Sequence, residues 1–301
     1  MKIIDAHMHV VHHVCGFGAQ GELTAIGNGK AMYASGAVID IIPPQLGQDT
    51  VTPEKVIALM DRENVERGVL LQGMYLGFQN LYVAQAIRRF PDRLAGAATY
   101  DPFCQGKDAI RSHLFDQLGF SIEKFEVAAL MSYHGRVPLD GDVMTEAFDY
   151  CDEHGHLCVM DLGNPHAVSC QIEAMRAQIL RHPGMNFVIC HILAPRKGDK
   201  ELMCAGLERL KLPNVWFDYA SLFSATRPGD YPFPTAQQYL LCAKQIVGAD
   251  RLMFGSDLPS TLTRTSYANL RDYPLEGGVF SPEEAQLVFY ENAKQVYFGG
   301  K

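Results

Sequence analysis

The sequence of 301 residues lacks several features that would assign it to particular classes of protein. It contains no apolar run of about 18 or more residues, so we expect no transmembrane helix and no membrane partner. It has no basic cluster and its formal net charge is −8, which argues against binding to nucleic acid. The N-terminal residues show no signal-peptide pattern, which favours a cytoplasmic protein.

The eight cysteines include no Cys-X-X-Cys pair. In a chain of this length without a signal peptide, a framework of disulfides is not expected. We therefore predict that most cysteines are reduced core residues. Cys158 and Cys190 illustrate this, because both lie inside apolar runs.

Short runs rich in Val, Ile, Leu and Ala recur along the chain at regular spacing. They are continuously apolar rather than alternating, as expected for parallel strands covered on both faces. Hydrophobic residues make up 48% of the chain, which is ample for a large core. The predicted strands begin near Lys2, Arg67, Leu94, Phe125, Leu157, Asn186, Asn214 and Leu252.

Segments with helical periodicity separate these runs. The segment 51–64 begins with Thr52 as N-cap and Pro53 in the first turn, and Ser281 with Glu284 forms a capping box before a C-terminal helix over 282–297. Further helices are predicted over 80–90, 141–154 and 168–182. This alternation predicts an α/β fold, a single (β/α)8 TIM barrel over residues 1–301, with an open doubly wound sheet as the alternative.

Two long loops interrupt the alternation, residues 10–50 after the first strand and residues 223–235 after the seventh. Loops that follow the strands of such a barrel lie at its C-terminal face, where active sites are built. We therefore predict that both loops form walls or lids of a substrate pocket, with 10–50 as an active-site insertion.

Polar residues stand at the ends of several predicted strands. His7 and His9 alternate around Met8, so an extended strand directs both imidazoles to the same side. Two imidazoles on one side form half of a transition-metal site. Strand ends of one barrel converge on one face, and the candidate metal ligands are therefore His7, His9, Asp161, His191 and Asp257.

With these motifs the chain resembles the amidohydrolase superfamily. The resemblance is to the amidohydrolase-related branch that includes proteins similar to 2-amino-3-carboxymuconate-6-semialdehyde decarboxylase. It covers essentially the whole chain and implies a (β/α)8 barrel with one divalent metal ion, usually zinc. The residues that carry it are Ile4-Asp5-Ala6-His7-Met8-His9, Cys190-His191, Phe254-Gly255-Ser256-Asp257-Leu258-Pro259 and Glu291-Asn292-Ala293.

The resemblance also implies residue roles. His7 and His9 would be metal ligands, and Asp257 would be a ligand or the general base that takes a proton from water. His191 would polarise the substrate oxygen or bind the metal or its water. Asp257 as a cap of the following loop and His191 as a structural core histidine are the alternatives.

The chain departs from the family pattern at Asp161, where a histidine is usual. An aspartate can bind zinc, and a second carboxylate shifts the preference towards manganese or iron. Alternatively the metal is weakly held or absent, Asp161 is structural, or His166 reaches back to the site. We place the end of the fourth strand at Ala129-Leu130-Met131, without a lysine, which argues against a binuclear site bridged by a carbamylated lysine.

Four further residues are candidates for the substrate pocket. His12 and His13 lie just beyond the metal motif, where they would line the pocket or face solvent. Arg196 and Arg227 would pair with a substrate carboxylate or, alternatively, form surface ion pairs.

The leading functional prediction is a mononuclear metal-dependent hydrolase, with Asp257 and His191 as catalytic residues, that attacks an amide, ester or lactone carbonyl of a small molecule. A non-oxidative decarboxylase of an aromatic or muconate-type acid is the first alternative. A metal-free binding or scaffold barrel is the second. Analogy with the fold also suggests a homodimer.

Overall fold

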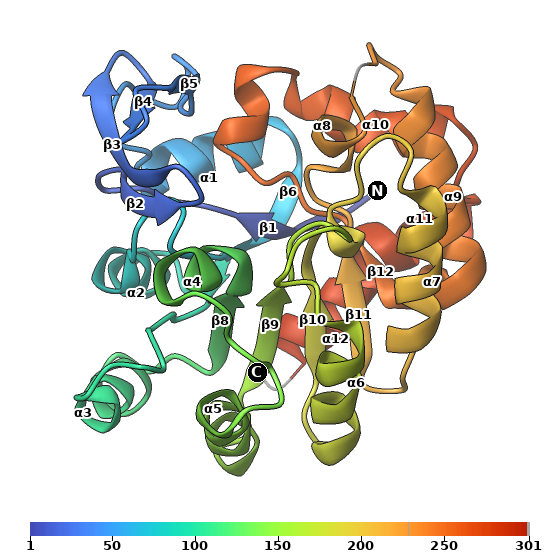
Figure 1. Ribbon diagram of the computed structural model, residues 1–301. Coiled ribbons are helices and arrows are strands. Elements are labelled where there is room, and N and C mark those ends of the chain that lie inside the picture. The colour runs from blue at the N-terminus through green and yellow to red at the C-terminus, as the bar shows by residue number, and fades with distance from the viewer. Residues whose placement is uncertain (228, 300–301) are drawn as a thin grey trace.

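Parallel strands run through the centre of the computed structural model, which describes residues 1–227 and 229–299 (Figure 1). Pro228 in the second long loop and residues 300–301 lie outside the described part. The central strands are β1 (Ile3–Met8), β6 (Val65–Leu70), β7 (Leu94–Gly96), β8 (Ile122–Glu126), β9 (Leu157–Asp161), β10 (Phe187–Ile189), β11 (Val215–Asp218) and β12 (Leu252–Met253).

The central strands follow one another in chain order. One sheet has the order β1-β6-β7, and a second has the order β12-β11-β10-β9-β8. A parallel bridge between Ala98 and Glu123 joins the two sheets on one side. On the other side, the Ala6 N–H donates to the Phe254 carbonyl at 2.9 Å. The predicted TIM-barrel fold is confirmed, and its first and last strands are neighbours.

Helices cover the outside of the strands, and each of the five segments for which the sequence predicts a helix contains one. The Thr52 hydroxyl accepts the Lys55 N–H at 3.3 Å, and Ser281 with Glu284 forms the predicted capping box. None of the described helices combines the length and apolar character needed to cross a bilayer. The helices are α1 (Pro53–Arg62), α2 (Asn80–Arg89), α3 (Lys107–Arg111), α4 (Val127–His134), α5 (Asp142–Glu153), α6 (Ile172–Arg181), α7 (Lys200–Leu210), α8 (Leu222–Ala225), α9 (Pro234–Val247), α10 (Tyr267–Glu276), α11 (Pro282–Gln286) and α12 (Asn292–Phe298).

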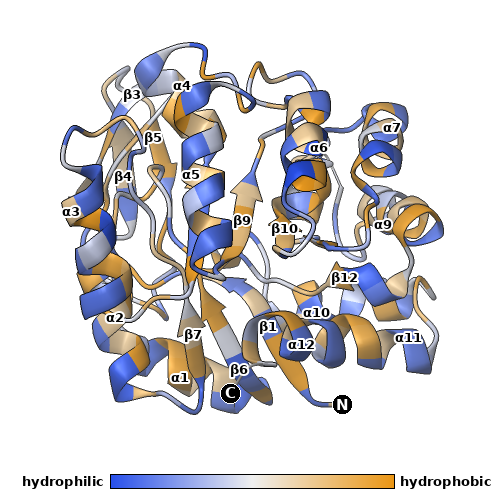
Figure 2. Cartoon of the chain, turned by 90° about the horizontal axis from the view of Figure 1, so that it is seen from below, coloured by the Kyte–Doolittle hydropathy of each residue, from blue (hydrophilic) through white to orange (hydrophobic). Residues whose placement is uncertain are grey.

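The hydrophobic core has two parts. One fills the space enclosed by the strands and includes Ile4, Val69, Val159 and Val188, together with Phe298 of α12. The other lies between the strands and the surrounding helices. Figure 2 shows the hydrophobic strands β7, β9 and β10, and helices α5 and α6 with hydrophilic residues along part of their surface. The interior of the barrel is therefore packed, and the polar residues at the strand ends lie at its C-terminal face.

The insertion after β1 is an antiparallel sheet, where the sequence predicts only a long loop. Its strands are short, and glycines at the turns break the apolar pattern, which hides them from periodicity. Residues 16–21 match the Gly-X-Gly-X-X-Gly motif, which marks dinucleotide-binding sites in open doubly wound sheets when it lies between a strand and a helix. Here it lies in a β-hairpin and therefore does not support that alternative fold. The strands are β2 (Cys15–Gly18), β3 (Gly21–Gly27), β4 (Lys30–Tyr33) and β5 (Val38–Asp40).

The fourth central strand corrects one prediction. Strand β8 ends at Glu126, and Ala129-Leu130-Met131 belongs to helix α4. The charged residues Glu123 and Lys124 masked the true start of the strand. Lys124 is buried and lines the cavity at the strand ends, so the inference that this strand brings no lysine to the site is wrong.

A single disulfide is present among the described residues, and it joins Cys204 of α7 to Cys242 of α9. The other six cysteines are free, which agrees with the prediction that most are reduced. Cys158 and Cys190 are both buried, as predicted.

Candidate active site

The first and last central strands bring two imidazoles and one carboxylate together. His7 and His9 lie at the end of β1, and Asp257 follows β12 with its N–H donating to the His7 carbonyl at 2.7 Å. The Oδ1 atom of Asp257 lies 3.0 Å from His9 Nε2 and 3.7 Å from His7 Nε2. His9 and Asp257 are 248 positions apart in the sequence, yet all three side chains lie together at the C-terminal end of the barrel.

Each imidazole at the site is anchored through its Nδ1 atom. His7 Nδ1 lies 3.1 Å from Asp218 Oδ2, and His9 Nδ1 lies 2.7 Å from the Leu71 carbonyl oxygen. His191 Nδ1 lies 2.9 Å from the Ala220 carbonyl oxygen. Since carbonyl and carboxylate oxygens only accept, each Nδ1 carries a proton and each Nε2 is left for the cavity.

A second carboxylate faces the third imidazole. His191 Nε2 lies 3.7 Å from Asp161 Oδ2, and the rings of His191 and His7 are 4.7 Å apart. His191 and Asp257 both have a positive φ, at 60° and 55°. Left-handed backbone at a non-glycine residue costs free energy and is typically retained at functional sites.

This donor set fits a divalent metal ion. The ligand atoms of His7, His9 and Asp257 all lie within 4.8 Å of one another. Neutral Nε2 atoms that face a carboxylate repel it unless a proton or a cation lies between them. These tautomers match those of histidines that bind a metal ion together with a carboxylate. In such sites one ring nitrogen binds the ion and the other donates a hydrogen bond to the protein. Asp161 and His191 lie opposite this group in the same cavity.

The electrostatics of the site keep the carboxylate of Asp257 charged. Burial raises the pKa of Asp257, but the contact with His9 Nε2 and the neighbouring imidazoles of His7 and His191 outweigh it and hold this pKa far below its usual range. Burial lowers the pKa of His7 to about 4, against the attraction of Asp218. For His191, burial is outweighed by Asp161 and by the other carboxylates, and its pKa is raised.

Lys124 and Glu126 are site residues that sequence reasoning missed. Both project from β8 into the cavity of about 100 Å³ at the strand ends. Burial lowers the pKa of Lys124, but its neighbours Cys190, Asp161 and Glu126 raise it more, so the net shift is upward. Burial, opposed by Lys124, raises the pKa of Glu126 to about 7. The cavity is lined by His7, His9, Gly73, Tyr75, Leu76, Lys124, Glu126, Asp161, His191, Asp257 and Ser260.

Asp218 was also missed, although it ends the apolar run of the seventh strand in the same way as the predicted residues end theirs. Its carboxylate accepts the backbone N–H groups of His191 at 2.9 Å and Ala220 at 3.1 Å in addition to His7 Nδ1. Despite complete burial, which raises its pKa, the nearby charges of His7 and His191 lower it to about 2. Asp218 is therefore a charged anchor beneath the site.

A wider hollow continues outward from the cavity. It has a volume of about 590 Å³ and shares Asp161 and His191 with the inner cavity. Arg196 and Arg227, the two predicted substrate-binding arginines, both line it. Arg264, which the sequence did not single out, contacts Ser224 on the same wall, and both burial and the charge of Arg227 lower its pKa. The outer hollow is thus rich in positive charge.

The remaining predicted residues lie elsewhere. His12 and His13 are exposed and are not among the residues that line either cavity. His166 does not reach back to the site, since its Nε2 lies 3.0 Å from Asp199 Oδ1. The sequence could not decide these orientations, because all three residues lie in loops.

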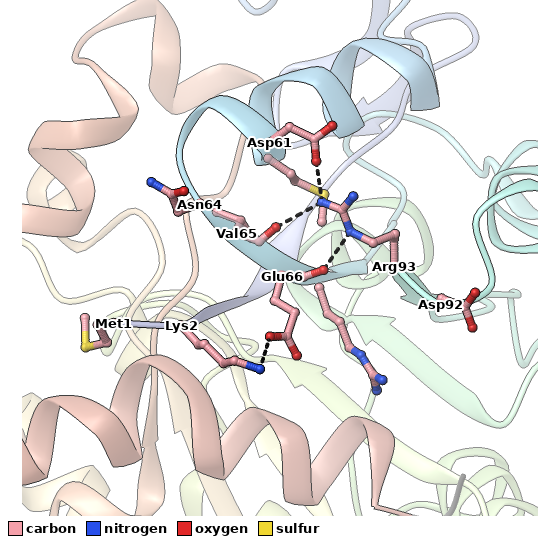
Figure 3. Close-up of a pocket in the computed structure, with 10 residues that line it drawn as sticks. Met1, Lys2, Asp61, Asn64, Val65, Glu66, Asp92 and Arg93 are labelled. Carbon is pink, nitrogen blue, oxygen red and sulfur yellow. Dashed lines mark hydrogen bonds and ion pairs between the residues drawn. The ribbon is translucent and has the colours of Figure 1, made fainter.

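A larger surface hollow, of about 890 Å³, lies at the opposite end of the barrel, around the N-terminal ends of β1, β6 and β7 (Figure 3). Its charges are largely paired with one another: Lys2 contacts Glu66 at 2.7 Å and Arg93 contacts Asp61 at 2.8 Å. It contains no histidine. The chemistry of the strand ends is therefore confined to the other face.

A family model described as amidohydrolase matches residues 4–299. The chain belongs to the amidohydrolase family. No curated protein matches its sequence.

Solved structures share the amidohydrolase barrel at low sequence identity. A probable 2-pyrone-4,6-dicarboxylic acid hydrolase from Acinetobacter baumannii, with citric acid bound, has a TM-score of 0.72 at 18% identity over 99% of both chains. An amidohydrolase from Burkholderia multivorans with bound zinc has a TM-score of 0.71 at 17% identity over 99% of both chains. A 2,6-dihydroxybenzoate decarboxylase from Rhizobium has a TM-score of 0.59 at 15% identity, over 82% of this chain and 88% of the other. These similarities establish the fold.

Proposed function

We propose that this amidohydrolase is a metal-dependent hydrolase that adds water to the carbonyl carbon of a lactone, ester or amide in a small carboxylate-bearing molecule. The observation that carries the proposal is the position of Asp257. Its Oδ1 atom lies 3.0 Å from His9 Nε2, at the floor of a cavity that opens into a positively charged hollow. A carboxylate so placed can take a proton from a water molecule beside the reacting carbonyl.

The residues His7, His9 and Asp257, with Asp161 opposite, would hold one divalent ion, zinc by its preference for imidazole, or manganese or iron. When bound, such an ion polarises the carbonyl and makes water more acidic. Ser221 donates its hydroxyl proton to Asp257 Oδ2, which orients the carboxylate with Oδ1 towards His9 and His7. His191, whose pKa is raised by the surrounding carboxylates, can donate from Nε2 to the oxygen that gains charge.

The substrate carboxylate is assigned from the charges that surround the site. Lys124 is a cation at the cavity floor, and Arg196 and Arg227 lie on the wall of the outer hollow. Guanidinium groups bind carboxylates through two parallel hydrogen bonds, which fixes the orientation of the ligand as well as its charge. A substrate with a carbonyl near Asp257 and a carboxylate some distance away therefore suits both cavities.

Decarboxylation is the second candidate, because Lys124 places a positive charge in the inner cavity, where it would hold a carboxylate beside the metal-ligand group. The two candidates differ in product. The purified protein would be incubated with lactones, esters and amides that carry a carboxylate, and with aromatic and muconate-type acids. Ring opening or acid release supports the hydrolase, whereas release of CO₂ supports the decarboxylase.

Metal content separates both candidates from a binding or scaffold barrel. We expect a divalent ion that survives dialysis, is lost on chelation together with turnover, and restores turnover when added back. A protein that retains no ion at the active site and turns over none of the panel would contradict the proposal.

A further inference from the structure

A second cluster of metal-ligating side chains lies on the outer side of the strands, away from the active site. Glu123 of β8 and Cys158 of β9 are register partners in the parallel pair. Cys151 lies near the end of α5, and His156 lies in the turn between α5 and β9. Glu123, Cys151 and Cys158 have no exposed surface, and His156 is 9% exposed.

The polar atoms of this cluster converge. His156 Nδ1 lies 2.8 Å from Glu123 Oε1, and the ligand atoms of Glu123, Cys151 and His156 all lie within 4.8 Å of one another. The Cys151 thiol donates to the His156 carbonyl oxygen at 3.6 Å, and its contact with Cys158, together with burial, raises the pKa of Cys151 well above its usual value. Three donors, one of them sulfur, thus lie close together between β8, β9 and α5, and the Cys158 thiol lies beside that of Cys151.

One oxygen of the cluster is left without a partner. Glu123 Oε2 is fully buried and has no hydrogen-bond partner among the described residues. Arg111, the cation whose charge acts on Glu123, directs its own hydrogen bonds to Tyr100 and Glu146 instead. A buried carboxylate oxygen without a partner is costly, and a native structure normally satisfies it. A cation bound at the cluster would provide that missing partner.

We propose that Glu123, Cys151, His156 and Cys158 bind a structural zinc ion that is separate from the active site. Two sulfurs, one imidazole nitrogen and one carboxylate oxygen are the donor types that zinc accepts in four-coordinate structural sites. Zinc binding displaces the protons of the two thiols into solvent and gives Glu123 a positive partner. With four protein ligands, this site leaves no position for a substrate, so the ion stabilises the packing of α5 against β8 and β9.

Cobalt replaces zinc in such sites and reports sulfur ligands through a thiolate-to-cobalt charge-transfer band. The donors assigned to the active-site ion are nitrogen and oxygen atoms, but Cys190 lies near His7, so the loss of the band in the variants of Cys151 and Cys158 is what assigns it to the second site. We expect the band in the cobalt-loaded protein, its loss in C151S and in C158S, and its retention in D257N and in the control C170S. A cobalt-loaded protein without the band, or a band that survives both C151S and C158S, would overturn the proposal.

X-ray absorption on zinc-loaded D257N gives a second measurement that does not require the cysteine variants to fold. We expect sulfur neighbours at about 2.3 Å from the zinc ion. A first shell of nitrogen and oxygen alone would refute the site. So would a disulfide between Cys151 and Cys158, found by mass spectrometry of the protein alkylated without reduction. Failure of the active site to bind metal or turn over substrate would leave these outcomes unchanged.

Discussion

The Nδ1 atom of His7 lies 3.1 Å from Oδ2 of Asp218, although 211 positions of the sequence separate the two residues. The other oxygen of Asp218 accepts the backbone N–H of His191 at 2.9 Å. One buried carboxylate therefore fixes the orientation of one imidazole and the backbone position of another. This arrangement, beneath the cavity rather than in it, sets which nitrogen atoms face the substrate.

Asp257 is the residue on which turnover is expected to depend most. The variant D257N keeps the shape of the side chain but cannot accept a proton from water, so we expect kcat/KM to fall by about 10²–10⁴-fold. The midpoint of thermal unfolding should change little. The matched control is D250N, on an exposed aspartate of the segment that precedes β12. Near-normal kcat/KM in D257N would show that another group moves the proton.

Removal of the charge of Asp218 should weaken metal binding without removing any ligand. In D218N the amide can no longer hold the Nδ1–H tautomer of His7 by charge, and we expect the dissociation constant for zinc to rise about 10–100-fold. A chelator competition titration measures this constant, with D92N at an exposed site as the control. Unchanged zinc affinity would remove Asp218 from the positioning of His7.

Gly255 is required by the close approach of two strands. A Cβ atom at this position would lie 2.6 Å from the Cβ atom of His7 and 3.1 Å from that of Ala220. We expect G255A to lower the free energy of unfolding by about 1–3 kcal/mol and to weaken metal binding, because His7 must move. G106A, where a Cβ atom meets nothing within 4 Å, is the control in the same denaturant titration. Equal stability of the two variants would contradict this packing.

The pH dependence of stability should carry opposite contributions from His7 and Asp5. The pKa of His7 is lowered by burial to about 4, so between pH 4 and about 6.5 the unfolded state binds a proton that the folded state does not. Its contribution therefore makes stability rise with pH, by up to about 1.4 kcal/mol per pH unit. The pKa of Asp5 is raised by burial to about 6, so this carboxyl keeps a proton when folded and makes stability fall with pH over a similar range.

Single variants separate these two effects in the metal-free protein. Urea unfolding between pH 4 and pH 6.5 should give a smaller slope of stability against pH in H7N than in the parent chain, and a larger slope in D5N. Slopes that shift in the reverse directions would show that the two groups are not buried in these protonation states.

The positive wall of the outer hollow should determine the affinity for an anionic substrate. Loss of Arg227 removes a charged hydrogen-bond donor of about 1.5–3 kcal/mol, and we expect R227A to raise KM by roughly 10–100-fold with little change in kcat. R176A, an arginine on the exposed side of α6, is the matched control. The same measurement with an uncharged substrate analogue should show no difference between R227A and the parent chain.

Much of the fold could be predicted because the relevant signals are local. The helix at Pro53–Arg62 follows from Thr52 and Pro53, and the capping box at Ser281 follows from the spacing to Glu284. Parallel strands buried on both faces leave long apolar runs, which periodicity detects. The start of strand β8 was not predicted, because its buried face carries Lys124. The charge of Lys124 is tolerated there only because carboxylates of the cavity surround it.

The same distinction between local signals and long-range packing applies to the residues of the candidate site. Sequence alone determined that His7 and His9 share one side of a strand and that polar residues end several strands, because both follow from backbone geometry over a few residues. Tertiary structure decided that Asp218, Lys124 and Glu126 join them while His12 and His166 do not. Those positions depend on which strands become neighbours and where loop side chains point, and such long-range packing leaves no periodic signal in the chain.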